Sequence, residues 1–300
     1  MGVGRFFAAG VVAGAVTVAS RAAFGLLPQD QGQRWIRTNH RGEPISLYEG
    51  PAVAAGVVAG TLAAGALAQD RAISRGSVAT AVAVTSAATF GLIDDLCEDT
   101  SQRSKGLRGH LGALSRGHLT TGGLKVLGIG AGAAGAAAII GAGQRPVGDW
   151  VIDTALIAGS ANLVNLLDLR PGRALKTSSG GALIGLLTHQ DPSLGAVAGA
   201  AGAAWPGDLD ERDMLGDCGA NALGAALGAS LAAHGSRGAR VVATAVIIGL
   251  TVASERVSFS RVIESTPWLQ RVDLWGRRAA SSASSSECAP GDGVPAAREG

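Results

Sequence analysis

Apolar stretches almost free of charge recur along this chain, and they constrain its fold more than any other feature. The segment 126–143 contains no Asp, Glu, Lys or Arg at all. Hydrophobic residues make up 47% of the chain and charged residues 16%, against about 25% charged residues in an ordinary soluble protein. So few charges would not cover the surface of a soluble protein of 300 residues. The sequence therefore predicts an integral membrane protein whose helices are rich in small residues.

The same composition excludes several other classes of protein. The apolar content is too high for a chain that is mostly disordered. Three cysteines, far apart in the sequence, are too few for a disulfide scaffold. The net charge of +2 gives no overall signal for nucleic acid, so we expect no nucleic-acid partner.

Nine segments are candidates for membrane-spanning helices, since a span needs about 20 mostly apolar residues, and fewer where neighbours bury it. They are residues 6–27, 51–68, 78–93, 126–143, 150–167, 180–187, 194–205, 215–233 and 241–254. A secretory signal peptide is the alternative for the first segment. We expect an all-α bundle of about nine spans within residues 1–278, with an interfacial amphipathic helix at 261–278 and a disordered tail at 279–300.

The basic residues divide unequally between the two sets of alternate loops. Leaving out Arg21 and Arg298, seventeen Lys and Arg residues fall in one set and six in the other. The positive-inside rule places the richer set in the cytoplasm. With nine spans, the N-terminus is then outside the plasma membrane and the C-terminus and the acidic segments are on its cytoplasmic face.

Three groups of acidic residues meet this same face, next to apolar segments. Asp94 and Asp95 follow the third segment, Asp168 ends the fifth, and Asp217 opens the eighth. Asn162, Asn165 and Asp168 are three residues apart, so they would share one face of a helix. Carboxylate and amide oxygens are the ligands that Mg²⁺ prefers, often together with substrate phosphates. These residues therefore predict a metal-assisted phosphate site at the membrane surface, with nearby Lys and Arg holding anionic head groups.

Four segments together resemble the polyprenyl-phosphate N-acetylhexosamine-1-phosphate transferases, a superfamily that includes phospho-N-acetylmuramoyl-pentapeptide transferase. They occur in the order that the superfamily has, and the resemblance covers about residues 5–275. The segments are Arg37–Pro44, like the first cytoplasmic loop; Phe90–Asp95 with Ser104–Leu107, like the Asp-Asp loop; Asn162–Asp168, like the Asn-x-x-Asn-x-x-Asp motif; and Met214–Gly224, like the Gly-Asp-x-Gly-Ser segment.

The resemblance implies transfer of a sugar-1-phosphate from a UDP-sugar to undecaprenyl phosphate, with Mg²⁺ and release of UMP, in the synthesis of cell-envelope glycans such as peptidoglycan. It implies a ten-helix fold and makes a homodimer plausible. By position, Asp94 and Asp95 would bind the metal or position the lipid phosphate, Asp168 would act as base or position a phosphate, and Asp217 would bind Mg²⁺. Lys105 would neutralise phosphate, and Asn162 and Asn165 would belong to the substrate site.

The sequence departs from the superfamily at three places. Pro171 stands where the second motif usually continues with a second Asp, the His-rich motif of the last cytoplasmic loop is absent, and there is no tenth span. Arg170, Arg173 and Lys176 are candidate replacements, because Arg binds phosphate with two parallel hydrogen bonds. These departures leave open a homologue without catalysis that binds polyprenyl phosphate or assembly partners. A transporter is the third possibility, for which only Asp153 lies inside a span and no basic partner is evident.

Overall fold

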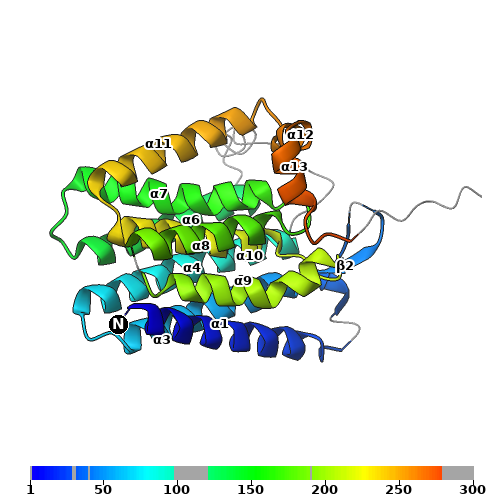
Figure 1. Ribbon diagram of the computed structural model, residues 1–300, viewed down its shortest axis with the longest axis horizontal. Coiled ribbons are helices and arrows are strands. Elements are labelled where there is room, and N and C mark those ends of the chain that lie inside the picture. The colour runs from blue at the N-terminus through cyan, green and yellow to red at the C-terminus, as the bar shows by residue number, and fades with distance from the viewer. Residues whose placement is uncertain (1, 29–31, 40, 98–120, 190, 279–300) are drawn as a thin grey trace, which may run out of the picture.

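The computed structural model describes residues 2–28, 32–39, 41–97, 121–189 and 191–278, and most of these residues are helical. The long helices lie side by side along one axis (Figure 1). They are α1 (Gly2–Phe24), α3 (Glu49–Ala66), α4 (Arg71–Cys97), α6 (Thr121–Gly141), α7 (Val147–Leu167), α8 (Arg173–His189), α9 (Leu194–Leu209), α10 (Gly216–His234) and α11 (Arg237–Ser254). The shorter elements are η1 (Gln33–Trp35), β1 (Ile36–Thr38), β2 (Pro44–Ser46), α12 (Phe259–Ser265) and α13 (Pro267–Leu274).

Each apolar segment of the sequence lies largely within one long helix, so the prediction of a helical bundle is confirmed for the described residues. The helices extend beyond several of the predicted limits. The helix α8 begins at Arg173 rather than at residue 180, and α9 continues through Pro206 to Leu209. The predicted limits stop short because charged residues, which the interior of a span excludes, are allowed at the ends of a helix.

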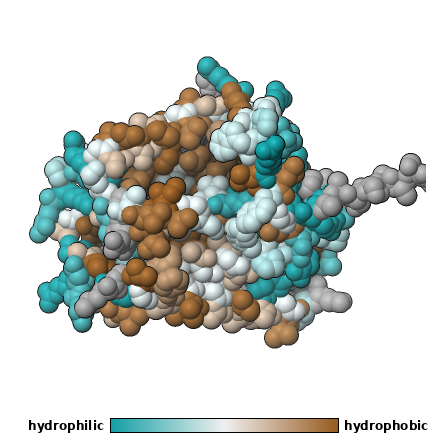
Figure 2. Space-filling model, viewed as in Figure 1, coloured by the Kyte–Doolittle hydropathy of each residue, from teal (hydrophilic) through white to brown (hydrophobic). Residues whose placement is uncertain are grey.

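Six helices of the described part are long and apolar enough to cross a membrane, namely α1, α3, α4, α6, α7 and α11. The helices α8 and α9 are shorter, at 17 and 16 residues. On the face shown in Figure 2, apolar side chains form a broad central region and hydrophilic side chains gather at both ends. This arrangement is typical of a helical membrane protein, in which lipid surrounds the apolar part.

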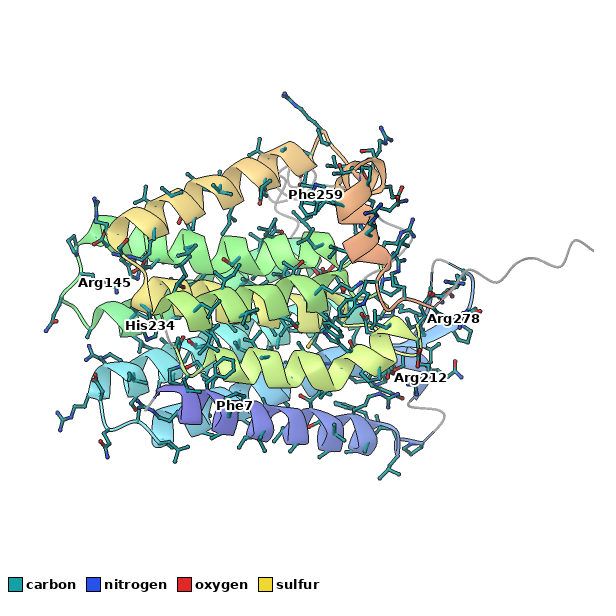
Figure 3. All side chains as sticks on the ribbon, viewed as in Figure 1. Phe7, Arg145, Arg212, His234, Phe259 and Arg278 are labelled. Atoms are coloured by element: carbon teal, nitrogen blue, oxygen red, sulfur yellow. The ribbon has the colours of Figure 1, made fainter. Side chains whose placement is uncertain are left out.

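The helices alternate in direction, so the loops gather at two ends. One end carries the β1–β2 hairpin, Arg212 and Arg278, and we call it the hairpin end (Figure 3). The other carries Arg145 and His234, and we call it the Arg145 end. The described segments of the loop set that is richer in Lys and Arg lie at the hairpin end, while residues 98–120 and 279–300 lie outside the described residues.

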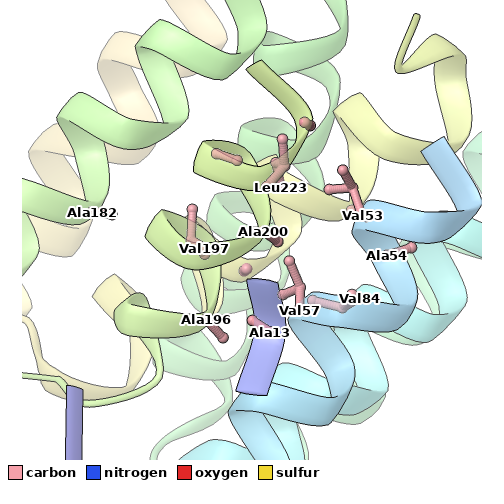
Figure 4. Packing of buried hydrophobic residues seen from close by; sticks show 14 of the residues in the cluster. Ala13, Val53, Ala54, Val57, Val84, Ala182, Ala196, Val197, Ala200 and Leu223 are labelled. Carbon is pink, nitrogen blue, oxygen red and sulfur yellow. The ribbon is translucent and has the colours of Figure 1, made fainter. Parts of the chain in front are cut away.

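Small side chains let the central helices approach one another closely. Ala13, Val53, Val57, Ala200 and Leu223 belong to one buried cluster that joins α1, α3, α9 and α10 (Figure 4). Alanine favours helix, and glycine is retained where two backbones touch. Membrane helices gain stability from such van der Waals contact, because lipid gives apolar side chains little reason to associate.

The contact between α1 and α9 gives a direct test of this packing. A Cβ atom at Gly199 would lie 2.0 Å from the carbonyl oxygen of Gly10, whereas one at Gly202 of the same helix would meet nothing within 4 Å. We expect Gly199→Ala to lower the melting temperature of the purified protein by several degrees, since α1 must move away. Gly202→Ala is the matched control and should leave the protein equally stable or stabilise it by about 0.5–1 kcal/mol. Equal melting temperatures for the two variants would contradict this packing.

The segment before α3 forms a hairpin that an all-α prediction does not include. Strands β1 and β2 are antiparallel, and Ile36 pairs with Ser46. Gly42 in the turn has φ +83°, a conformation that favours glycine. The segment 261–278, predicted as one amphipathic helix, is divided into α12 and α13 because Pro267 begins the second helix.

Candidate functional site

Three helices bring the four predicted acids toward the hairpin end. Asp94 and Asp95 lie in the last turn of α4, Asp217 lies in the first turn of α10, and Asp168 directly follows the last residue of α7. The backbones of α4 and α10 touch here, since a Cβ atom at Gly91 would lie 2.4 Å from the carbonyl oxygen of Asp217. The structure thus brings together residues that are more than 120 positions apart in the sequence.

The start of α10 is bound by carboxylates from both neighbouring helices. The backbone N–H groups of Asp217 and Cys218 donate to the two carboxylate oxygens of Asp95, over 3.0 and 2.9 Å. The backbone N–H of Gly216 donates to Asp168. The first N–H groups of a helix have no partner within the helix and favour an anion. Asp95 and Asp168 therefore occupy positions that would otherwise be available to a phosphate.

Gly216 makes this arrangement possible. Its φ is +58°, and a Cβ atom there would lie 2.9 Å from Oδ2 of Asp95. We expect Gly216→Ala to destabilise the protein by more than the roughly 1–2 kcal/mol that the left-handed conformation alone costs, because it also displaces Asp95. Gly42→Ala is the matched control, with φ +83° and nothing within 4 Å of its added Cβ. Thermal unfolding of the two variants separates the cost of the left-handed backbone from the cost of the contact with Asp95. Equal losses of stability would show that Asp95 tolerates the added methyl group.

Lys125 of α6 is a central residue of the site that was not predicted as a functional residue. Its ammonium group lies 2.6 Å from Oδ2 of Asp94 and also forms an ion pair with Asp217. The Lys125 side chain is only 18% exposed. The signal in the sequence was its position directly before the uncharged segment 126–143, the same kind of boundary position that selected the acids.

Carboxylates are suitable Mg²⁺ ligands, but their arrangement here does not by itself form a metal site. Among the residues that the structure describes, no group of three or more His, Cys, Asp and Glu side chains is placed to hold a metal ion. Lys125 takes the position between Asp94 and Asp217 that a divalent cation would need. Asp95 already accepts two backbone hydrogen bonds. A bound ion would therefore require Lys125 to move.

The carboxyl group of Asp168 is buried close to other acidic side chains. Burial raises the pKa of this carboxyl group well above its usual range, and the negative charges of Asp208, Asp217 and Asp95 raise it further. The hydrogen bond from the Gly216 backbone acts in the opposite direction and is the smaller effect. A carboxylate whose pKa is raised is a stronger base than an ordinary aspartate, which suits it to accept a proton from a substrate.

The three predicted phosphate-binding cations have different surroundings. Arg173 is 5% exposed, and its guanidinium donates to both carboxylate oxygens of Asp273 on α13, over 2.6 and 3.2 Å. Lys176 donates to the backbone carbonyl oxygen of Asp273 over 2.7 Å. Arg170 is more accessible and lies 4.0 Å from Glu264 of α12. Arg173 and Lys176 therefore hold α13 against α8, and Arg170 is the least engaged of the three.

The remaining predicted site residues are less closely connected to the acids. Asn162 is exposed on α7 and donates to Oγ1 of Thr251 on α11 over 3.5 Å, so it points toward another helix. Asn165 contributes its backbone carbonyl oxygen to the N–H of Asp168, which lies just past the helix. Lys105 lies outside the described residues. The prediction that Asn162, Asn165 and Asp168 share one helix face therefore fails at Asp168, because α7 ends at Leu167.

Asp153 has the basic partners that were not evident from the sequence. It is completely buried in α7, and its two carboxylate oxygens lie 2.5 Å from guanidinium nitrogens of Arg145 and Arg240. Asp149 adds contacts with Arg237 and Arg240. These ion pairs lie toward the Arg145 end, away from the four acids (Figure 3). They join α7 to α11, and Arg145 also donates to the backbone carbonyl oxygen of Ala232 on α10, so the cluster has a structural role.

Comparison with known proteins gives no assignment for this arrangement. The sequence matches no protein-family model, and a search of curated proteins returns no significant match.

Proposed function

We propose that the protein transfers a sugar-1-phosphate from a UDP-sugar to a polyprenyl phosphate such as undecaprenyl phosphate, in cell-envelope glycan synthesis. One observation carries this proposal: Asp94, Asp95, Asp168 and Asp217 converge, together with Lys125, at one end of an apolar helix bundle. Such a site can receive a lipid phosphate from the membrane and a sugar nucleotide from the solvent. The motif resemblance supports the same reaction.

Two of these residues have clear roles in the proposed reaction. Asp168 accepts a proton from the lipid phosphate, for which its raised pKa suits it. An oxygen of that phosphate then attacks the phosphorus atom next to the sugar, a P–O bond to the uridine phosphate breaks, and UMP leaves with the bonding electrons. Lys125 offsets part of the negative charge that gathers around the phosphates.

Mg²⁺ remains the proposed cofactor, because diphosphate substrates bring their own oxygen ligands to a metal that one or two carboxylates hold. When bound, it would spread the charge of the diphosphate. Asp94 and Asp217 are the residues that would hold it, after Lys125 has moved aside. The absence of a preformed group of ligands in the described residues means that the substrate would complete the site.

The proposed placement has nine spans in the plasma membrane, with the N-terminus outside and the hairpin end in the cytoplasm. The excess of Lys and Arg in the loops of the hairpin end supports this orientation. A cytoplasmic hairpin end would give the four acids access to a nucleotide-sugar.

A homologue without catalysis that binds polyprenyl phosphate is the second candidate. The observation that favours it is that the acids already have partners within the protein: Asp95 the start of α10, and Asp94 and Asp217 the ammonium group of Lys125. Pro171, in place of a second motif Asp, points in the same direction.

An activity assay separates the two candidates. The detergent-purified protein is given Mg²⁺, undecaprenyl phosphate and a panel of UDP-sugars, and release of UMP is measured. We expect Mg²⁺-dependent UMP from at least one donor, and a loss of at least 100-fold in Asp168→Asn and Asp217→Asn. Asp210→Asn, on an exposed side chain that forms an ion pair with the exposed Arg212, is the matched control and should retain activity.

Two other outcomes of this assay would count against the proposed reaction. No UMP from any donor, with the wild type still stabilised by polyprenyl phosphate in a thermal shift, would favour the lipid-binding homologue. UMP release that is equal in the wild type and both Asp variants would exclude these acids from the reaction.

A further inference from the structure

A pocket with mostly apolar walls opens between α1, α3 and α9 near the hairpin end. Its volume is about 340 Å³, near the lower limit of about 300–1,000 Å³ for ligand pockets. Its walls are mostly apolar and include Val18, Ala22, Ala52 and Ala203. Four charged residues also line it, namely Arg21, Glu49, Arg212 and Asp213. None of these four belongs to the predicted transferase site.

Glu49 is the unusual residue of this pocket. It is only 3% exposed, and its Oε1 atom has no hydrogen-bond partner among the described residues. The other oxygen, Oε2, lies toward Gly207, which also adjoins Oδ2 of Asp213. A buried carboxylate oxygen without a partner costs free energy of about 1–3 kcal/mol or more. A ligand that donates a hydrogen bond would remove this cost.

The charges around Glu49 favour a cationic group. Asp208 and Asp213 add to the negative potential at Glu49, and Arg21 partly offsets it. Arg21 is itself committed to Asp213, to which it donates two hydrogen bonds of 2.9 and 2.8 Å. A primary ammonium group is positively charged and carries N–H donors, so it would both offset the negative potential and donate a hydrogen bond to Oε1 of Glu49. A metal ion fits less well, because hard cations require six or more oxygen ligands and the pocket lining supplies two carboxylates.

The mouth of the pocket suits an anionic group on an apolar carrier. Arg212 is 66% exposed, and its ion pair with the equally exposed Asp210 is weak enough to be replaced by a phosphate. On α1, Val18 lines the pocket and is also 59% exposed, on the same helix surface as the exposed Val11. The helix α1 is one of those apolar enough to cross a membrane. The pocket therefore adjoins a lipid-facing surface.

We propose that this pocket binds the headgroup of a phospholipid that carries a primary ammonium group. The ammonium donates to Glu49, the phosphate lies near Arg212, and the acyl chains follow the apolar surface of α1. This proposal is independent of the transferase reaction, since it uses none of its residues.

A thermal-shift titration of the full-length, delipidated protein in detergent tests the proposal. The probes are phosphatidylethanolamine, phosphatidylcholine and phosphatidylglycerol with identical acyl chains, together with soluble phosphoethanolamine. We expect phosphatidylethanolamine to bind at least tenfold more tightly than the other two lipids, because phosphatidylcholine has no N–H donors and phosphatidylglycerol has no cation. Phosphoethanolamine should compete with it, which would identify the headgroup as the recognised part.

Variants decide whether the pocket is responsible. Glu49→Gln should abolish the preference for phosphatidylethanolamine, whereas Glu43→Gln, on the hairpin outside the pocket, should retain it. Val18→Trp, at an exposed position on α1, should fill the mouth and abolish the preference even if Glu49→Gln fails to fold. Equal affinities for the three lipids, a preference that survives both pocket variants, or a stability gain from Mg²⁺ that requires Glu49 would overturn the proposal.

Discussion

Replacing Lys125 with Gln should destabilise the protein in the absence of divalent cations and make its stability depend on Mg²⁺. The ammonium group of Lys125 forms ion pairs with both Asp94 and Asp217. Without it, the two carboxylates face each other. The Asp94 and Asp217 side chains are within hydrogen-bonding reach of each other. Two negative charges this close repel each other once the ammonium group is gone, so we expect the melting temperature to fall by several degrees. A divalent cation would then take the vacated position.

Thermal unfolding with and without millimolar Mg²⁺ measures this effect. The Lys125→Gln variant should recover much of its lost stability in Mg²⁺, while the wild type should respond little, because its ammonium group competes with the ion. Lys176→Gln is the matched control: this lysine donates to the carbonyl oxygen of Asp273, so its loss should not create a response to Mg²⁺. Identical Mg²⁺ responses in the wild type and both variants would contradict the idea that Lys125 occupies the cation position.

The same experiment connects the structure with the two candidate functions. If Mg²⁺ binds once Lys125 is removed, then Asp94 and Asp217 form a latent metal site that the lysine keeps closed. A substrate diphosphate could open this site by drawing the ammonium group away. If Mg²⁺ does not bind even then, the acids serve to hold α4, α6 and α10 together, as expected of a homologue without catalysis.

The helical framework could be predicted because hydrophobicity is a local property of the sequence. The uncharged segment 126–143 falls largely within α6, and the segments 180–187 and 194–205 lie in separate helices, α8 and α9. The convergence of Asp94, Asp168 and Asp217 could be predicted from the alternating direction of consecutive helices, because it requires only that the helices be recognised in order.

The pairing of charges could not be predicted in this way. Arg173 was expected to meet phosphate, but it forms a buried ion pair with Asp273, which is 100 residues away in the sequence. Lys125 was counted only as a positive loop residue, although it bridges two acids. Such partners depend on the rotation of each helix about its axis. That rotation is set by close contacts such as Gly91 against α10, and not by the hydrophobic pattern of any one segment.

Removing Asp153 from the ion-pair cluster at the Arg145 end should lower the stability of the protein more than any other substitution described above. Asp153 is completely buried, and it binds both Arg145 and Arg240 over 2.5 Å. Arg240 is itself buried, and its other acidic contact, with Asp149, is longer at 3.7 Å. Removing one partner of a buried ion pair typically costs about 3–5 kcal/mol, because the remaining charge has lost its compensation. We therefore expect Asp153→Ala to unfold at a much lower temperature than the wild type.

Two further variants show whether the loss arises from the orphaned arginine. Asp149→Ala is the matched control, since its main partner Arg237 is 70% exposed and can turn toward solvent, so its loss should be less than half as large. The double variant Asp153→Ala/Arg240→Met should recover part of the stability, because a methionine in place of Arg240 leaves no unpaired charge there. If Asp153→Ala is as stable as the wild type, the cluster does not hold α7 to α11, and a buried acid that the fold does not need would reopen the case for ion transport.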